Sequence, residues 1–476
     1  MTRFLISETT KYVGEKVKVA GWVNIRRAHG KIIFIDLRDR SGILQLVFIP
    51  SNKEVYELAD SLRTEWVIEV TGQIVKRPEN MVNPKIGTGQ VEISVETLNI
   101  LSKAETLPFS IETDGREINE EIRMKYRYLD LRRERMKQNL IVRHKVVKFI
   151  RDFLSNENFI EIETPILTKS TPEGARDFIV PSRLQPGKFY ALPQSPQQYK
   201  QLFMMAGLEK YFQIARCFRD EDQRGDRQME FTQLDLEMSF VEQEDVIELQ
   251  ERMLIKLVEV LFPDKKIQQI PFPRLIHKES MEKYKIDRPD LRKDKNDSNL
   301  LAFCWVIDFP FFEKKDEGNW TFTHNPFSAA KPEFTQDLLD KKNIDKIIAN
   351  QYDIVLNGFE IGGGSIRNHN SQALEKVFEI MGYKIEEIKE KFGHIINAFN
   401  YGAPPHGGIA LGLDRIISIL QNEPNIREVI AFPKTGDGRD LMMDSPSKIY
   451  PKQLKELHIK INPDKSAKKT KDNEIY

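Results

Sequence analysis

The sequence is poor in cysteine, has no long apolar run and carries no net charge. Its two cysteines, Cys217 and Cys304, form no spaced pair in 476 residues, which excludes a zinc ribbon and a disulfide scaffold. The longest apolar stretch, near residues 300–307, is far too short to cross a bilayer. Residues 1–12 lack the apolar core of a signal peptide. We therefore expect a soluble, cytoplasmic protein with no membrane partner.

Charge and length limit the remaining classes of protein. Lys and Arg total 72 residues, and Asp and Glu also total 72. A neutral chain of this kind is not a bulk polyanion binder, so any contact with nucleic acid must come from a local patch. At about 150 residues per domain, the length predicts roughly three domains and at least two.

The N-terminal part of the chain predicts a small β-barrel. Short segments rich in Val and Ile, separated by Gly, Asn and Asp turns, predict strands at 17–23, 32–37, 43–48, 67–75 and 91–98. One helix, 55–62, is predicted between the third and fourth strands. Five strands with a helix in that place are the plan of an oligonucleotide-binding (OB) barrel, although the pattern alone leaves another small barrel open. We assign residues 1–102 to this domain.

The rest of the chain predicts a hinge, an α+β domain and a polar tail. Residues 103–138 are rich in charge and are interpreted as a hinge, in which Arg132, Arg133 and Arg135 belong to a solvated face that could also touch RNA. Helices are predicted at 139–156, 244–260, 375–380 and 414–420, and strands at 159–163, 211–218 and 231–240. This order indicates an antiparallel sheet flanked by helices over 139–463, followed by a disordered tail, 464–476.

The sequence contains neither of the two common phosphate-binding loops, GxxxxGK[ST] or GxGxxG after a strand. It offers other groups that suit a nucleotide. Arg219 ends a predicted strand, a charged turn leads to Phe231, and Arg415 lies at the start of a predicted helix. Arginine binds phosphate oxygens bidentately, and an aromatic ring can stack on a base. Either piece alone would be explained equally well by a charged hairpin or an ordinary helix start.

Together these pieces resemble the class II aminoacyl-tRNA synthetases, and most closely the bacterial-type aspartyl-tRNA synthetases. FIEIETP (159–165) resembles the first family motif, the segment from FRDE (218–221) to QMEF (228–231) the second, and GLDR (412–415) the third. Further runs that match the aspartyl branch are RYLDLRR (127–133), TPEGARDF (171–178), QSPQQYKQL (194–202) and NGFEIGGGSIR (357–367). The resemblance covers nearly the whole chain, including the barrel as an anticodon-binding domain.

One departure from the family pattern is plain. The large insertion between the second and third motifs is missing, because IDRPDLR, which ends at Arg292, runs through KDKNDSNL directly into LAFCWVIDFP. We infer that a peripheral domain near residues 263–299 is reduced and that the active site is intact.

The resemblance implies an ATP-dependent ligase that works in two steps. The α-carboxylate of aspartate attacks the α-phosphate of ATP, and the aspartyl group then passes to the 3′-terminal ribose of tRNA-Asp. Such chemistry needs positioning and charge neutralisation more than a protein nucleophile. By resemblance, the catalytic group comprises Arg219 on the α-phosphate, Glu221 on the adenine and Arg415 on the γ-phosphate, with Phe231 stacked on the adenine.

The same motifs imply the remaining site residues. The ATP site is expected to comprise Arg219, Asp220, Glu221, Gln228, Phe231, Glu360, Gly412, Leu413, Asp414 and Arg415. The aspartate site is expected to comprise Arg219, then Lys200 and Arg367 as readers of the side-chain carboxylate, Glu173, Ser195, Gln197 and Asp235 around the ammonium, and His324 in a mobile loop. Asp353 and Glu360 are oxygen ligands of the kind that Mg²⁺ prefers, and no organic cofactor is expected. A seven-residue offset within one strand would put the two carboxylates on opposite faces, so an acidic strand edge is the alternative.

Parts of the pattern also fit other functions. An asparaginyl- or lysyl-tRNA synthetase shares the barrel and core, and a non-catalytic RNA-binding paralogue would keep the fold. Arg367 after GGGS favours the aspartyl branch, whereas the intact Arg219 and Arg415 speak against a paralogue without activity.

The motif that ends in Pro165 resembles a dimer interface, so we expect a homodimer.

The barrel implies an anticodon site. Arg27 lies near it in sequence, Phe34 could stack on an anticodon base and Gln45 could hydrogen-bond its edge. His29, in the loop expected before Phe34, stands where strictly Asp-specific bacterial relatives commonly carry leucine, and Asn80 stands where they can carry lysine. An imidazole can hydrogen-bond more than one base edge, whereas leucine cannot. We therefore expect that tRNA-Asn is also charged and passed to a partner amidotransferase, with an ordinary exposed residue as the alternative for His29.

Overall fold

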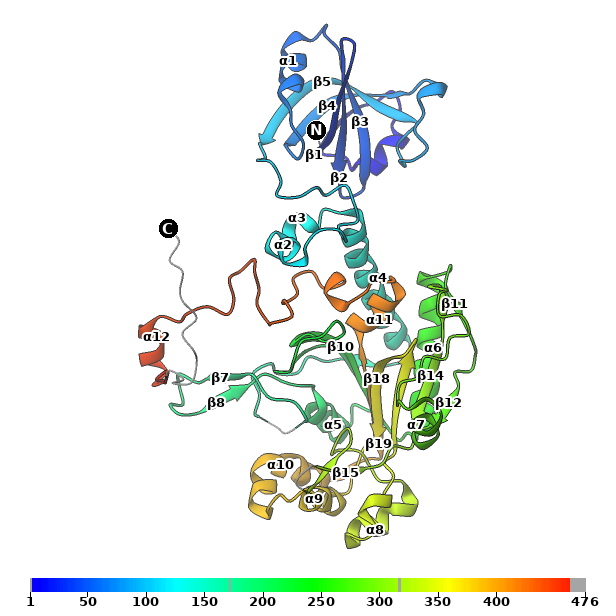
Figure 1. The fold of residues 1–476 in the computed structure, drawn as a ribbon, viewed down its shortest axis with the longest axis vertical. Helices are drawn as coiled ribbons and strands as arrows, with labels where there is room; N and C mark the ends of the chain where they lie inside the picture. The colour runs from blue at the N-terminus through cyan, green and yellow to red at the C-terminus, as the bar shows by residue number, and fades with distance from the viewer. Residues whose placement is uncertain (1, 171–172, 316–317, 463–476) are drawn as a thin grey trace. The chain divides into compact units, whose positions relative to one another are not determined.

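The computed structural model describes residues 2–170, 173–315 and 318–462. The chain divides into two compact units, Met1–Ser110 and Ile111–Tyr476 (Figure 1). The tail expected at 464–476 lies outside the described residues. Within the part of the chain that the structure describes, no helix combines the length and apolarity needed to cross a membrane.

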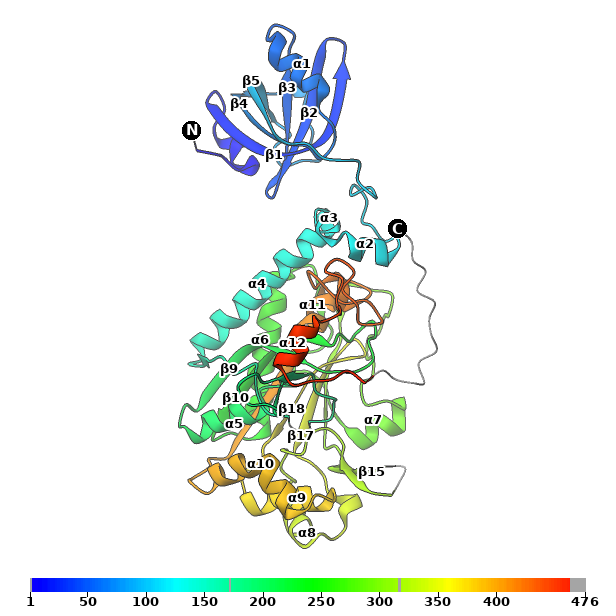
Figure 2. The same ribbon diagram turned by 90° about the vertical axis from the view of Figure 1, so that its left-hand side faces the viewer.

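The first unit is a closed five-stranded barrel with the strand order β1-β2-β3-β5-β4, which confirms the predicted OB fold. Its strands are β1 (Lys16–His29), β2 (Ile32–Asp39), β3 (Gly42–Phe48), β4 (Val67–Lys76) and β5 (Val91–Ser102). Helix α1 (Lys53–Ser61) connects β3 to β4, in the predicted place (Figure 2). Every second residue of the strands is buried, as in Val17 and Val19, because alternate side chains of a strand point into the barrel.

The structure corrects the loop that the sequence predicts before Phe34. Strand β1 continues through His29, which pairs with Ile32 of β2, so the connection is a tight turn at Gly30 and Lys31. Gly30 has a φ of +58°, a conformation that glycine adopts without steric cost. His29 is therefore an exposed residue at the tip of a two-stranded hairpin.

The second unit contains an eight-stranded sheet with the order β12-β14-β17-β18-β19-β10-β9-β6. These strands are β6 (Ile160–Glu161), β9 (Lys210–Phe218), β10 (Glu230–Ser239), β12 (Arg274–Ile276), β14 (Phe303–Ile307), β17 (Gln351–Leu356), β18 (Phe359–Ile366) and β19 (His406–Gly412). The six inner strands are antiparallel, as predicted, and the edge strands β12 and β6 pair in parallel with their neighbours.

Three helices cover one face of this sheet and enclose the main hydrophobic core. They are α4 (Glu134–Asn156), α6 (Gln243–Leu261) and α11 (Leu413–Leu420) (Figures 1 and 2). The sheet contributes every second residue of its central strands to the core, including Leu234, Leu236, Tyr352, Ile354, Ile409 and Leu411. The intervening residues of the same strands point to the opposite face of the sheet. Several of them are polar and can bind a ligand there.

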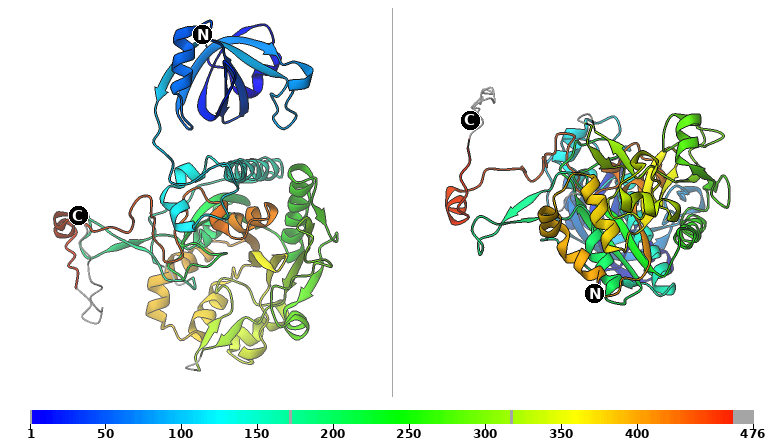
Figure 3. Two further views of the ribbon diagram at one scale, coloured as in Figure 1. Left: turned by 45° about the horizontal axis from the view of Figure 1, so that its top comes forward. Right: turned by 90° about the horizontal axis from the view of Figure 1, so that it is seen from below.

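Smaller elements complete the second unit. Helices α8 (Thr335–Asp340), α9 (Ser371–Ile380) and α10 (Ile385–Phe399) gather at one end of it, and α7 (His277–Tyr284) lies beside β12. Strands β7 (Ile179–Pro181) and β8 (Phe189–Ala191) form a hairpin that projects beside α12 (Pro451–Glu456), as Figure 3 shows. There Arg183 Nε lies 3.7 Å from Glu456 Oε2.

The charged segment predicted as a hinge contains two short helices, α2 (Glu120–Lys125) and α3 (Arg127–Asp130), and belongs to the second unit from Ile111 onward. The buried carboxylate of Asp130 accepts from three arginines, Arg123, Arg127 and Arg133, at 2.7–3.2 Å. Arg135 is paired with Glu423 and Glu428. Arg133 and Arg135 therefore use their charge in internal ion pairs and do not offer it to RNA.

Candidate active site

A cavity of about 340 Å³ opens on the face of the sheet opposite the helix-covered core. It is lined by alternate residues of the central strands: Gln233 and Asp235 of β10, Gln351 and Asp353 of β17, and Ala410 and Gly412 of β19. The period of two that places Leu234 and Leu236 in the core therefore also places these residues in the cavity. Helix α5 (Gln197–Met205) and the start of α11 contribute from its rims.

Nearly all the residues that the sequence suggests for the site line this one cavity. They are Glu173, Ser195, Gln197, Lys200, Arg219, Glu221, Gln228, Phe231, Asp235, His324, Asp353, Glu360, Arg367, Gly412, Asp414 and Arg415. Two suggested residues do not line it. Leu413 is fully buried in the hydrophobic core, and Asp220 pairs through its backbone with Arg176.

Four buried charged residues form a cluster at the cavity, three of them in its lining and the fourth, Glu237, behind it. Arg367 donates from Nε to Glu237 Oε1 at 2.9 Å and from Nη2 to Glu237 Oε2 at 3.1 Å. Lys200 Nζ lies 2.9 Å from Asp235 Oδ2 and 3.3 Å from Glu237 Oε2. Burial alone would raise the pKa of Glu237, but Arg367 and Lys200 hold it below its ordinary value. The cluster is therefore neutral as a whole, with its two cations fixed in place.

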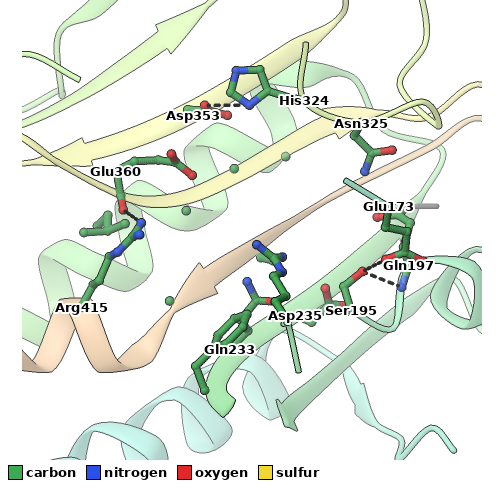
Figure 4. Close-up of a pocket in the computed structure, with 18 of the residues that line it drawn as sticks. Glu173, Ser195, Gln197, Gln233, Asp235, His324, Asn325, Asp353, Glu360 and Arg415 are labelled. Carbon is green, nitrogen blue, oxygen red and sulfur yellow. Dashed lines mark hydrogen bonds and ion pairs between the residues drawn. The ribbon is translucent and has the colours of Figure 1, made fainter. Parts of the chain in front are cut away.

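Acceptor groups lie beside these cations. Asp235 is fully buried, its pKa is raised to about 6 by burial, and its Oδ1 has no hydrogen-bond partner in the described part of the chain. Ser195 Oγ donates to Glu173 Oε2 at 2.8 Å and accepts from the backbone N–H of Gln197 at 3.3 Å (Figure 4). This wall of the cavity suits a positively charged group on a ligand.

Two further arginines, Arg219 and Arg415, line the cavity. The guanidinium carbon of Arg219 lies 5.1 Å from the ring centre of Phe231, and the buried Nε of Arg219 has no partner among the described residues. Arg415 donates to the backbone oxygen of Glu360 at 2.7 Å and lies 3.2 Å from Asp226 Oδ2. Both arginines are held in the cavity wall while keeping some donors unused, which suits an anionic ligand.

Two of the residues suggested for ATP have clear structural partners. Asp414 Oδ2 accepts from the backbone N–H of Thr232 at 2.9 Å and so ties α11 to β10. Gln228 exchanges two hydrogen bonds with the backbone of Lys434, at 2.8 and 3.1 Å. Each side chain therefore joins the cavity wall to a segment distant in sequence.

The carboxylates of Asp353 and Glu360 share one face, which corrects the opposite faces that the sequence suggests. The two residues lie on neighbouring antiparallel strands, joined by a tight turn at Asn357 and Gly358 with φ values of +52° and +85°. Both carboxylates lie over Gly363, where a Cβ would come within 2.8 Å of Asp353 Oδ1 and 3.9 Å of Glu360 Oε1. His324 Nδ1 lies 3.6 Å from Asp353 Oδ2 (Figure 4).

Burial of this carboxylate pair is costly without a cation. The pKa of Asp353 is raised to about 7, first by burial and then by the charge of Glu360, with His324 acting in the opposite direction. Among the described residues, no three His, Cys, Asp or Glu side chains converge as a complete metal cage. Two carboxylates alone do not complete the coordination of a metal ion. They suit an ion such as Mg²⁺, which is usually bound by one or two protein carboxylates together with the phosphates of a substrate.

Several residues at or behind the cavity are not among those that the sequence suggests. Glu237 anchors both buried cations, and Asn325 and Gln351 line the wall near His324. The period-two spacing of Gln233, Asp235 and Glu237 on one strand would have revealed Glu237. Asn325 lies in a loop, where spacing carries no such information.

The residues suggested for the anticodon lie on the outer surface of the barrel. Arg27 pairs with Phe34 across β1 and β2, and its guanidinium donates to Asp36 at 2.7 Å. Gln45 donates to Glu92 at 2.8 Å and accepts from Arg27 at 3.4 Å. Phe34 is half-buried, whereas His29 and Asn80 are exposed and make no close contact with this group. The surface therefore combines an aromatic face with polar edges.

Both units match known families. Residues 119–436 match the family of tRNA synthetases class II (D, K and N), and residues 17–101 match the OB-fold nucleic acid binding domain family. An aspartate–tRNA(Asp/Asn) ligase of Dictyoglomus turgidum is 44% identical, with 95% of this chain and 96% of that protein covered. An aspartate–tRNA ligase of Macrococcus caseolyticus is 40% identical, with 97% and 98% covered. The first alignment extends over 579 positions, more than the 476 residues of this chain, so that relative carries residues without a counterpart here.

Solved structures share the fold. An asparaginyl-tRNA synthetase from Pyrococcus horikoshii, in complex with asparaginyl-adenylate, superposes with a TM-score of 0.74 at 22% identity, covering 95% of this chain and all of that one. A putative aspartyl-tRNA synthetase from Leishmania major gives 0.73 at 19% identity, with 91% and 94% covered. The family match and the close relatives together show that this chain belongs to the class II tRNA synthetases of the D, K and N group.

Proposed function

We propose that this chain is an aspartate–tRNA ligase, which activates L-aspartate with ATP and transfers it to tRNA. The observation that carries the proposal is the set of unused donors at Lys200 and Arg367. Arg367 has five N–H groups, and three of its hydrogen bonds go to Glu237 and Ser365. Lys200 has three N–H groups and contacts two carboxylates, Asp235 and Glu237. Both residues therefore offer a ligand only hydrogen-bond donors, and no acceptors.

A carboxylate satisfies this end of the cavity, and the alternatives do not. The carboxamide of asparagine would present its NH₂ group, also a donor, to at least one of these donors. The ammonium of lysine would meet two cations. Sites built around such polar pairing can reject a mismatched analogue by roughly 10⁴–10⁵-fold. The names of the relatives, which are aspartate–tRNA ligases, agree with this choice.

The remaining residues have roles that follow from their positions. Asp235 Oδ1, Glu173 and Gln197 would accept from the α-ammonium of aspartate. Arg219 and Arg415 would bind the phosphates of ATP, with Glu221 and Phe231 at the adenine. Since the α-carboxylate of aspartate is itself the nucleophile, the chain has to align it with the α-phosphate and to neutralise charge.

A magnesium ion fits the chemistry of the donor set on β17 and β18. Asp353 and Glu360 would hold it above Gly363, where the missing Cβ leaves room for both carboxylates. When bound together with ATP, Mg²⁺ supplies positive charge to the phosphate oxygens. A cation at this place would offset the two effects that raise the pKa of Asp353, burial and the charge of Glu360.

We further propose that the enzyme charges both tRNA-Asp and tRNA-Asn in the cytoplasm and supplies the second product to an amidotransferase. The support is the exposed His29 at the tip of the β1–β2 hairpin, together with relatives named aspartate–tRNA(Asp/Asn) ligases. A homodimer is proposed through the segment around Pro165, where Ile160, Ile166 and Leu167 expose apolar side chains.

Exchange of pyrophosphate into ATP tests the amino-acid assignment. The purified chain should support this exchange with aspartate and not with asparagine or lysine. Exchange with one of the other two, or with none, would contradict the proposal.

Light scattering at working concentration should give twice the monomer mass, and a monomer would contradict the proposed dimer.

A further inference from the structure

Behind the wall of the cavity lies a buried chain of four polar groups. Gln197 Nε2 donates to Gln201 Oε1 at 3.0 Å, one turn along α5. Gln201 Nε2 lies 3.0 Å from His406 Nε2 on β19. His406 Nδ1 lies 2.8 Å from the backbone oxygen of Pro404. Gln201 and His406 are both fully buried, and Gln197 is 4% exposed, so water does not compete for these contacts.

The backbone oxygen of Pro404 sets the direction of every hydrogen bond in this series of four groups. A carbonyl oxygen only accepts, so His406 must carry its proton on Nδ1 to bond Pro404. In the neutral ring Nε2 is then an acceptor, and burial keeps the pKa of His406 below its ordinary value. Gln201 must therefore turn its NH₂ toward His406 and its oxygen toward Gln197.

The same constraint reaches the cavity. Because Gln197 uses Nε2 to donate to Gln201, its amide oxygen is the end left for a ligand, and it accepts no hydrogen bond from the described residues. A flipped amide would present NH₂ instead, which repels a cationic ligand. Gln197 lines the cavity next to Ser195 and Glu173, on the side that offers acceptors (Figure 4).

We propose that Gln201 and His406 are positioning residues that fix the amide of Gln197 as an acceptor for the α-ammonium of the amino acid. This inference rests on the proposed function and deepens it. The side chain of Gln197 could turn either its amide oxygen or its NH₂ group toward the ligand, and the two buried residues select the oxygen. Neither residue touches the substrate, since Gln201 and His406 do not line the cavity.

The binding of aspartate and that of succinate, compared in the same variants, test the role of this series of hydrogen bonds. Succinate keeps both carboxylates and lacks only the ammonium. In Gln201→Met, which has similar volume and no polar end, we expect the affinity for aspartate to fall roughly ten- to a hundredfold, the scale of a hydrogen bond to a charged group. The inhibition constant of succinate in the exchange reaction should stay within about twofold, because its contacts do not depend on Gln197.

Two further variants separate polarity from structure. Gln201→Glu keeps an acceptor toward Gln197 and should retain most of the affinity for aspartate. His406→Gln removes the fixed tautomer and should reproduce the selective loss if Gln201→Met does not fold. Gln198→Met is the matched control: it is the neighbouring buried residue of α5, it lies outside the chain of four groups, and it should bind both ligands as the original protein does.

The outcomes distinguish this inference from the proposed function. If the original protein does not bind aspartate, the proposed function is wrong. If it binds aspartate but Gln201→Met weakens aspartate and succinate equally, or weakens neither, the positioning role is wrong. A Gln201→Glu variant as weak as Gln201→Met would also overturn it.

Discussion

Arg367 and Glu237 form a bidentate ion pair beneath the cavity, with Nε–Oε1 and Nη2–Oε2 distances of 2.9 and 3.1 Å and both side chains buried. Gly408 makes this arrangement possible, since a Cβ there would overlap the Glu237 carboxylate. Removing one partner of a buried pair leaves an uncompensated charge, which costs about 3–5 kcal/mol. Glu237 thus holds Arg367 without occupying all of its donors.

We therefore expect Glu237→Gln to lower the free energy of unfolding by about 3–5 kcal/mol and to weaken aspartate binding. Urea denaturation and calorimetry would measure the two effects. Glu230→Gln is the control, because Glu230 lies on the same strand, β10, and its ion pair with Arg216 of β9 is solvent-exposed and should contribute less than about 1 kcal/mol. Equal stability of the two variants would show that the buried pair contributes no more than the exposed one.

Arg219 and Arg415, which line the cavity, should be needed for adenylate formation. Arg219→Ala or Arg415→Ala should slow aspartate-dependent pyrophosphate exchange by roughly 10³-fold, since each would neutralise phosphate charge in the transition state. The far-ultraviolet circular dichroism should be unchanged. Arg216→Ala, near the end of the strand that leads to Arg219 but paired with Glu230 at the surface, should keep its activity. Near-normal exchange in either of the first two variants would show that the phosphate contacts are misassigned.

Asp130 should stabilise the second unit from within its arginine cluster. Its carboxylate accepts from Arg123, Arg127 and Arg133 at once. Asp130→Asn leaves three buried guanidinium groups with less compensation, so we expect a loss of about 3–5 kcal/mol in thermal or urea denaturation. Asp114→Asn, at an exposed ion pair with Arg116, should change stability by less than about 0.5 kcal/mol. A small effect of Asp130→Asn would mean that water or other groups take over.

Stability should depend on pH through His406. Burial lowers the pKa of this imidazole below 6.5, while Glu237 acts to raise it and Arg367 and His369 act to lower it. The unfolded chain therefore binds the proton more readily than the folded one, so the contribution of neutral His406 is complete above that value and is lost as the pH falls. The free energy of unfolding should fall more steeply between about pH 7.5 and pH 5 in the original protein than in His406→Gln. Parallel curves would refute this assignment.

The sequence predicts the architecture well where periodicity is long. The barrel strands and β10 carry a clear period of two, and α4 and α6 carry helical spacing over many residues. Strands β17, β18 and β19 are not predicted, and β17 is buried along its whole length, so it shows no alternation. The strand predicted at 159–163 is present as the shorter β6, whereas the edge strand β12 escapes prediction, since three residues show no clear period. No helix is predicted over 385–399, although α10 lies there and buries an apolar face with Phe392 and Ile395.

At the site, the motifs locate the residues but not their partners. The opposite-face interpretation of Asp353 and Glu360 failed because Asn357-Gly358, a common hairpin turn, was not recognised between them. The contact between Gln201 and His406 joins residues 205 positions apart, and no local pattern encodes it. Such long-range contacts follow only from the strand order of the folded sheet.

The choice of tRNA should depend on His29. His29 lies exposed at the tip of the β1–β2 hairpin, beyond the pair Arg27 and Phe34. If its imidazole tolerates the anticodon base that differs between tRNA-Asp and tRNA-Asn, His29→Leu should leave aspartylation of tRNA-Asp within about twofold and reduce that of tRNA-Asn by roughly tenfold, the equivalent of one hydrogen bond. Aspartylation of the two transcripts, measured side by side, gives both values. Lys31→Leu, at the same turn, controls for loss of general attraction to the RNA backbone, which should weaken both substrates alike. An original protein that prefers tRNA-Asp by several hundredfold would contradict dual charging, and an unchanged preference in His29→Leu would show that selectivity lies elsewhere on the barrel.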